Sequence, residues 1–149
     1  MRISEEIKQT KFDNVYLKAF INVMFTGSFL RFQQQQTLKP FGITMQQFNV
    51  LKILNGRHPK TMQAGEIKKV MIDKSPDLTR LINRLIKNGW VKREKSKTSG
   101  REVAISITKP GIAFLKKTEK VALKDVDLLN NLNEAEAELL SNLLDKVRE

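Results

Sequence analysis

The stretch from residue 77 to residue 87 constrains the fold most, because its apolar residues recur with the period of an α-helix. Five apolar residues follow the i, i+3, i+4, i+7, i+8 spacing, which places them on one buried stripe. They are Leu78, Leu81, Ile82, Leu85 and Ile86, and the opposite side carries Arg80, Asn83, Arg84 and Lys87. The segment therefore predicts a helix that packs with one face and can contact an anion with the other.

A long helix and a second, capped helix are predicted before this segment. Residues 12–36 contain one glycine and no proline, and their many apolar residues predict a helix that is buried on more than one side. Pro40 closes that helix. Thr44 and Gln47 have the spacing of a capping box, so we expect a second helix to begin here and to end at residues 55–56, Asn-Gly, in a left-handed cap.

A short helix and a turn connect the second helix to the amphipathic one. Residues 63–70 predict the short helix, and residues 72–75 predict the turn. Pro76 fits the first turn of the amphipathic helix, where a missing N–H costs nothing. The dipeptide Asn-Gly at residues 88–89 is typical of the end of a helix.

Beyond Gly89 the apolar period changes from that of a helix to that of a strand. Val103, Ile105 and Ile107 alternate with small or polar residues, which predicts a strand. The turn-forming residues 96–100 separate it from a basic strand, so the two strands form a hairpin with a cationic tip.

Two further helices are predicted after the hairpin. Thr108 can cap the first, and Asn133 with Glu136 can cap a final helix that runs to Val147. The predicted fold is mainly α with a small β-hairpin wing (α+β). Helix, helix, turn, helix and hairpin in this order form a winged helix-turn-helix, which we assign to residues 44–108.

The net charge of +11 is concentrated in the middle of the chain. Residues 60–110 hold 13 Lys and Arg against 5 Asp and Glu, whereas residues 111–149 hold 6 against 8. A cationic surplus on the segment that carries the amphipathic helix and the hairpin is typical of proteins that bind a polyanion.

Enzyme and metal chemistry find little support in the sequence. The chain has no cysteine, which excludes disulfides and zinc-finger sites, and its single histidine, His58, gives little support to a histidine-based metal cluster or triad. Asp125 and Asp127 are two residues apart, so they do not share a helix face as a catalytic pair, and glycine-rich phosphate loops do not occur. We expect no enzyme, no catalytic residue, no metal and no cofactor, and we assign no role to His58.

The sequence also gives no sign of membrane targeting. No apolar run approaches the ~20 residues that a membrane span needs. The first residues lack the apolar core of a signal peptide. We therefore expect a cytoplasmic protein without a membrane partner.

Four motifs resemble those of MarR-type transcriptional regulators and occur in the same order. Residues 75–85 (SPDLTRLINRL) are similar to the recognition helix of that family, and residues 88–93 (NGWVKR) to its first wing strand. Residues 41–48 (FGITMQQF) resemble the Gly-Leu-Thr-x-x-Gln start of its second helix, and residues 107–111 (ITKPG) the Leu-Thr-x-x-Gly step after the wing. The resemblance covers nearly the whole chain and implies a sequence-specific regulator that binds a near-palindromic DNA operator as a homodimer. It also implies release by a small aromatic acid bound between the dimer and DNA-binding parts.

The chain departs from the family at the tip of the hairpin. The family's wing usually carries an acidic residue two positions before an arginine, and that residue commonly buttresses the arginine. Here Ser99 stands two positions before Arg101, so the arginine is present and the acid is absent. The wing therefore keeps its positive charge at Arg101, but it lacks the acidic residue that commonly makes the wing of this family rigid.

The predicted DNA-binding face combines the amphipathic helix with its neighbours. A helix fits the major groove, and an arginine there can contact O6 and N7 of guanine together. Arg80, near the N-terminal end, is the first candidate for a base contact, and Arg84 for a base or phosphate contact. Lysines of the short helix and the turn suit phosphates, and the hairpin cations flank the duplex, with Arg101 reaching into the minor groove. The predicted residues are Lys68, Lys69, Lys74, Ser75, Pro76, Asp77, Thr79, Arg80, Asn83, Arg84, Lys95, Lys97 and Arg101.

The two ends of the chain predict a homodimer within one domain, residues 1–149. Residues 1–37 and 111–149 are assigned as dimerisation helices because both are more apolar than one buried stripe requires. The acidic C-terminal part is unsuited to DNA and rich in leucine: Leu128, Leu129, Leu132, Leu139, Leu140, Leu143 and Leu144. The alternative function is a winged-helix interaction module that places its basic face on an acidic protein partner.

Overall fold

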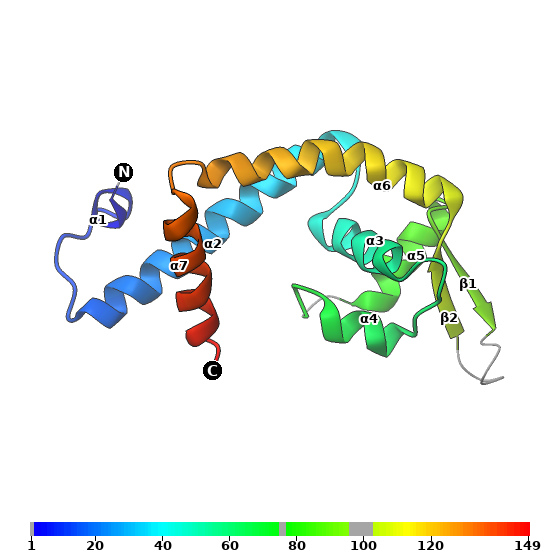
Figure 1. The fold of residues 1–149 in the computed structure, drawn as a ribbon, viewed down its shortest axis with the longest axis horizontal. Helices are drawn as coiled ribbons and strands as arrows, with labels where there is room; N and C mark the ends of the chain where they lie inside the picture. Colours follow the sequence, from blue (N-terminus) through cyan, green and yellow to red (C-terminus); the bar gives the residue numbers. More distant parts are fainter. Residues whose placement is uncertain (1, 75–76, 96–102) are drawn as a thin grey trace.

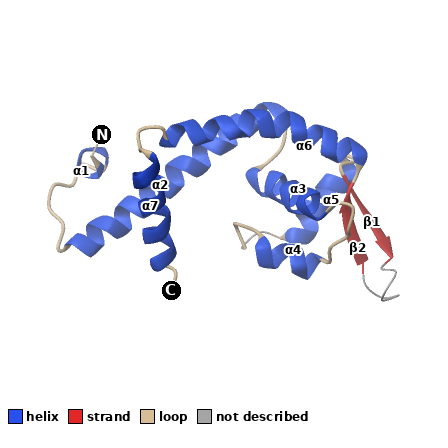
Figure 2. Ribbon diagram, in the orientation of Figure 1, coloured by secondary structure: helices blue, strands red, loops and turns tan. Residues whose placement is uncertain are grey.

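The computed structural model describes residues 2–74, 77–95 and 103–149. The described chain is mostly helical with one two-stranded antiparallel hairpin, so the predicted fold class is confirmed (Figure 2). The elements are α1 (Ile3–Glu6), α2 (Val15–Leu38), the 3-10 helix η1 (Lys39–Phe41), α3 (Met45–Arg57), α4 (Ala64–Val70), α5 (Leu78–Lys87), β1 (Val91–Lys95), β2 (Val103–Ile107), α6 (Lys109–Ala122), the 3-10 helix η2 (Leu123–Leu129) and α7 (Glu134–Lys146).

The molecule is elongated, with a compact lobe at one end (Figure 1). α3, α4, α5 and the hairpin form this lobe. α2 and α6 contact each other and run away from the lobe, and α1, α7 and both termini lie at the far end. We call α1, α2, η2 and α7 the helical arm.

Capping side chains fix the starts of α2 and α3. The Asn14 side chain accepts a hydrogen bond from the Leu17 N–H (2.9 Å), so α2 begins at Val15, three residues after the predicted start. After η1, Gly42 adopts a left-handed conformation (φ 65°) that turns the chain. Thr44 and Gln47 then form the predicted capping box, with reciprocal hydrogen bonds of 3.2 and 3.0 Å.

The predicted end of α3 at residues 55–56 is wrong. Gly56 does not have a positive φ, and the helix continues to Arg57. The cause is Pro59, because a residue before proline is pushed out of the helical region. His58 accordingly has extended torsions (φ −55°, ψ 135°), and the helix ends there.

α5 forms where the amphipathic pattern predicts it, but it begins at Leu78 after the N-cap Asp77, so the prediction that Pro76 belongs to its first turn is wrong. Leu78, Leu81, Ile82 and Leu85 are buried, and Ile86 is half-buried. Gly89 adopts a left-handed conformation (φ 73°) after Asn88, which confirms the predicted stop of this helix.

The hairpin closes the lobe on one side. β1 and β2 pair antiparallel with Val91 opposite Ile107. Met62, before α4, adds an isolated bridge to Ile105 through hydrogen bonds of 2.9 Å in both directions, which the sequence pattern did not predict. Both Met62 and Ile105 are buried in the core.

The first half of α6 belongs to the same core as the lobe. Thr108 caps this helix as predicted, accepting from the Gly111 N–H (3.1 Å) and donating to the Gly89 carbonyl (2.7 Å). Leu115 is buried in the core, and the ring of Phe114 stacks on Trp90 with centroids 3.7 Å apart. α6 thereby joins the hairpin to the helical arm.

The final helix, α7, also begins as the sequence predicts. Asn133 and Glu136 form a capping box with hydrogen bonds of 3.0 and 2.9 Å. No residue of α7 is buried in the single chain, although the helix is rich in leucine.

Candidate nucleic-acid interface

The outer face of α5 carries the central residues of the predicted interface. Thr79, Arg80, Asn83 and Arg84 are all exposed, since the buried stripe of this helix faces the core of the lobe. Lys87, which the predicted set omits, is exposed as well. α5 therefore presents cationic and amide groups from its first turn to its last.

Asp77 acts as the N-cap of α5. Its carboxylate accepts a hydrogen bond from the Arg80 N–H at 3.2 Å. An exposed carboxylate is a poor ligand for phosphate. Here it accepts from a backbone N–H that has no partner within the helix, and its negative charge complements the positive end of the helix dipole. The structure thus gives Asp77 a capping role beside its predicted place in the interface.

The other predicted cations that the structure describes lie on segments that flank α5. Lys68 and Lys69 are exposed in the last turn of α4, and Lys74 is exposed in the connection to α5. Lys95 ends β1 and pairs with Val103 in the hairpin. Figure 1 shows that α4, α5 and the hairpin are neighbours in the lobe.

Four predicted residues, Ser75, Pro76, Lys97 and Arg101, lie outside the described residues, as does Ser99. Arg93, a further cation that the predicted set omits, is exposed on β1 opposite Ile105 in the register. Its place in the charged run of residues 92–95 was the signal that could have found it.

Two side chains of α3 bind the connection between α4 and α5. The Ile72 N–H donates to Asn49 Oδ1 at 3.1 Å, and Gln46 Nε2 donates to Asp73 Oδ2 at 3.4 Å. Sequence periodicity gives no signal for either bond, because the bonded residues are 23 and 27 positions apart in the chain.

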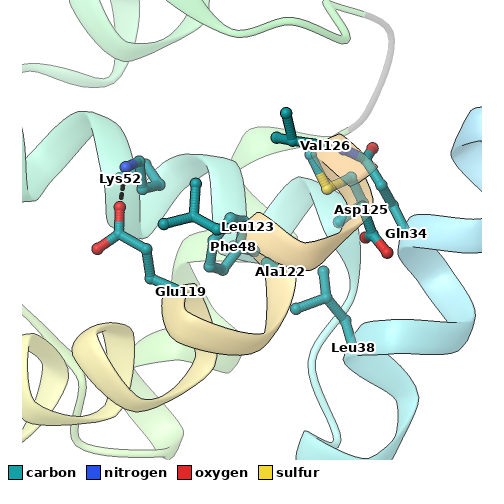
Figure 3. Close-up of a pocket in the computed structure, with 10 residues that line it drawn as sticks. Gln34, Leu38, Phe48, Lys52, Glu119, Ala122, Leu123, Asp125 and Val126 are labelled. Carbon is teal, nitrogen blue, oxygen red and sulfur yellow. Dashed lines mark hydrogen bonds and ion pairs between the residues drawn. The ribbon is translucent and has the colours of Figure 1, made fainter. Parts of the chain in front are cut away.

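Two cavities lie between the helical arm and the lobe. The first, of about 160 Å³, is shown in Figure 3 and contains the ion pair between Lys52 and Glu119 as well as the Asp125 carboxylate, to which the Thr37 hydroxyl donates at 2.7 Å. Its other lining residues are Gln34, Leu38, Met45, Phe48, Ala122, Leu123 and Val126.

The second cavity is larger, about 370 Å³, and lies beside the connection between α4 and α5. Its wall is mostly apolar, with Arg31 as the one cation among the residues that line it. The lining residues are Leu30, Arg31, Gln34, Gln35, Met45, Gln46, Asn49, Met71, Ile72 and Asp73.

The described ranges contain neither a metal site nor a membrane span. No cluster of three His, Asp or Glu side chains there is arranged to hold a metal ion. Among the helices described, none has the length and apolar character needed to cross a membrane.

Comparison with known sequences gives consistent matches. A family model described as transcriptional regulator SarA/Rot matches residues 33–119. The multiple antibiotic resistance protein MarR of Escherichia coli is 33% identical over 112 residues, which cover 74% of this chain and 76% of that protein. The HTH-type transcriptional regulator YwoH of Bacillus subtilis is 32% identical over 112 residues, which cover 72% of this chain and 77% of YwoH.

Solved structures agree with these matches. A crystal structure of a mutant MarR from Escherichia coli complexed with operator DNA has a TM-score of 0.77 and 27% identity, covering 93% of this chain and 99% of that one. AbsC, a MarR family regulator from Streptomyces coelicolor, has a TM-score of 0.80 at 19% identity and covers 93% of this chain and 96% of its own, which supports the fold alone. With its exposed basic helix, its hairpin and these relatives, the chain belongs to the MarR family of winged-helix transcriptional regulators.

Proposed function

We propose that this regulator binds double-stranded DNA in a sequence-specific manner, as a homodimer on a near-palindromic operator. The observation that carries the proposal is α5, which buries four apolar side chains and exposes Arg80, Asn83 and Arg84 on its other side. A helix of this kind fits the major groove of B-DNA. The relative that was crystallised with operator DNA supports the same use of the fold.

Each part of the lobe has its own role in this proposal. Arg80 contacts a guanine, because it lies near the N-terminal end of α5, which enters a groove deepest. Lys68, Lys69 and Lys74 contact phosphates and fix the register without reading sequence. The hairpin lies along the neighbouring minor groove, where Arg101 contributes its charge.

The helical arm supplies the second part of the proposal, the homodimer. Its exposed apolar side chains are too numerous for a monomer in water, so they need a partner face. The C-terminal part is acidic and therefore contacts protein rather than DNA. The most exposed of these apolar side chains are Val15, Tyr16, Phe20, Met24, Phe32, Leu123, Val126, Leu139 and Leu143.

Selection from a pool of random labelled duplexes tests the DNA part. We expect enrichment of an inverted repeat whose half-sites lie about one helical turn, ~10 bp, apart. Enrichment without inverted symmetry contradicts the dimeric geometry. No enrichment at all contradicts DNA reading and favours the alternative, an interaction module for an acidic protein.

Light scattering tests the homodimer independently of DNA. The full chain at micromolar concentration should have twice the mass of 17.1 kDa. A monomer mass under these conditions contradicts the proposal, since it leaves the apolar face of the arm in water.

A small aromatic acid is the proposed effector, and the 370 Å³ cavity is its proposed site. Arg31 can pair with a carboxylate there, while Leu30, Met45 and Ile72 offer apolar contact to a ring. The smaller cavity suits an acid less, because it contains two carboxylates and its lysine is already paired. In calorimetric titrations, salicylate should bind the wild-type protein more tightly than the Arg31→Gln variant. Salicylate should also release the selected duplex from the wild-type protein. Equal affinity of salicylate for the two proteins contradicts this site.

A further inference from the structure

Residues 71–74 follow α4 and precede the Asp77 N-cap of α5 in the chain, so their placement bears on where this helix starts. Met71 is anchored in the core, where it is 3% exposed, but the side chain of Ile72 next to it is 80% exposed. Packing thus holds one end of the connection and leaves the next residue without burial. α3 holds the connection through two hydrogen bonds, one to the Ile72 backbone and one to the Asp73 side chain.

α3 is a rigid base for these hydrogen bonds. Its inner face, with Val50, Leu51 and Leu54, is buried in the core. Gln46 and Asn49 are three residues apart, so they are neighbours on one side of the helix. Asn49 binds the Ile72 backbone and Gln46 binds the Asp73 side chain, which gives two bonds to adjacent residues of the connection.

The chemistry of the partners fixes which atom each amide presents. The Ile72 N–H is a donor, so Asn49 must offer its carbonyl oxygen. The Asp73 carboxylate accepts, so Gln46 must offer its NH₂ group. Position 49 therefore requires a hydrogen-bond acceptor, and position 46, one turn away, requires a donor.

We propose that Asn49 and Gln46 are positioning residues for sequence reading: they hold residues 72–73 on α3 and thereby set the placement of the N-terminal turn of α5. The inference rests on the proposed function, since a misplaced helix matters only if α5 reads bases. Base contacts tolerate errors of about 0.5 Å, whereas phosphate contacts by flexible lysines tolerate more. Loss of the two bonds therefore lowers discrimination between sequences more than it lowers affinity for DNA as such.

Two substitutions with the same change of charge test the proposal. Asn49→Asp keeps an acceptor for the Ile72 N–H, whereas Gln46→Glu removes the donor and places a carboxylate against Asp73. The measured quantity is the ratio of affinities for the selected duplex and a scrambled duplex, in which the general effect of an added negative charge cancels. We expect Asn49→Asp to keep this ratio, and both Gln46→Glu and Asn49→Leu to lower it about three- to tenfold.

Hydrogen exchange of the Ile72 amide provides a readout that does not depend on DNA. The amide should exchange faster in Asn49→Leu than in wild type, and Asn49→Asp should restore its protection. Thermal melting of each variant confirms that the lobe is folded, since neither side chain belongs to the buried core.

The possible results separate the positioning role from the proposed function. Suppose that wild type selects a motif. If Asn49→Asp and Gln46→Glu then give the same ratio of affinities for selected and scrambled duplex, or if the Ile72 amide exchanges equally in all variants, the positioning role is refuted. The proposed function stands in that case. If wild type selects no motif, the proposed function fails and the positioning role fails with it, whatever the amide does. Retention by Asn49→Asp with loss by Gln46→Glu supports the proposal.

Discussion

Substitution of Gly111 by alanine should strongly destabilise the junction between the hairpin and α6. A Cβ atom at this position would lie 2.1 Å from the Trp90 carbonyl oxygen and 2.9 Å from Ile107 Cγ1. The nearer atom belongs to the backbone, so no side-chain rotation can relieve the contact. The same carbonyl accepts the Thr108 N–H at 3.0 Å, so its displacement also disturbs the cap of α6.

The magnitude follows from these distances. Opening the closest contact from 2.1 Å to an ordinary van der Waals separation moves the backbone by about 1 Å. Overpacking of this kind costs about 1–3 kcal/mol, and loss of the Thr108 hydrogen bond adds about 1 kcal/mol. We expect Gly111→Ala to lower the free energy of unfolding by about 2–4 kcal/mol.

Gly65→Ala is the matched control. Gly65 lies in α4, where an added Cβ atom would meet no other atom within 4 Å, and its φ is not positive. The same substitution there should stabilise the protein by about 0.5 kcal/mol, because alanine favours the helix more than glycine does. Urea unfolding of both variants at one protomer concentration measures the difference, since a dimer's stability depends on concentration. Equal effects of the two substitutions, or a stable Gly111→Ala protein, would refute the expected clash with Trp90.

Four further predictions concern the interface residues and the cap of α5. Arg80→Ala should cost about 1–3 kcal/mol on the selected duplex and flatten preference at one base pair of each half-site, whereas Lys87→Ala, with the same loss of charge, should weaken selected and scrambled duplexes alike. Equal losses on both duplexes for Arg80→Ala would contradict its base contact. Arg101→Ala should weaken binding to all duplexes alike and make the logarithmic salt dependence of binding shallower by about one unit per lost contact. Ser99→Asp should strengthen binding if the support that the new acid gives the wing outweighs its added negative charge. Titrations at several salt concentrations decide both. Asp77→Ala should lower the free energy of unfolding by about 1 kcal/mol, because α5 loses its N-cap. Asp77→Asn keeps a capping oxygen, so its free energy of unfolding should stay within about 0.3 kcal/mol of wild type. Urea unfolding of the two variants measures both values.

Local signals in the sequence were enough to predict most elements of the lobe. The apolar stripe of α5, the capping box of Thr44 with Gln47 and the left-handed Gly89 all occur as expected. Each signal depends on residues within about one or two helical turns, so it can be recognised without knowing any contact between distant segments. The exposed face of α5, and with it the centre of the candidate site, follows from the same periodicity.

Other features depend on contacts between distant segments and left no local pattern. The bridge from Met62 to Ile105 and the hydrogen bonds of Asn49 and Gln46 join residues that lie far apart in the chain. The need for glycine at position 111 comes from the Trp90 carbonyl, which only the packing of α6 on the hairpin brings near.

The sequence by itself determined which segments of the lobe form helices and strands and which face of α5 is polar, because spacing and capping are local properties. The tertiary structure alone decided how the connection before α5 is held on α3, where the cavities between arm and lobe lie, and which apolar faces of the arm remain uncovered. These depend on which surfaces meet, and the free energy of such contacts is distributed over residues far apart in the chain.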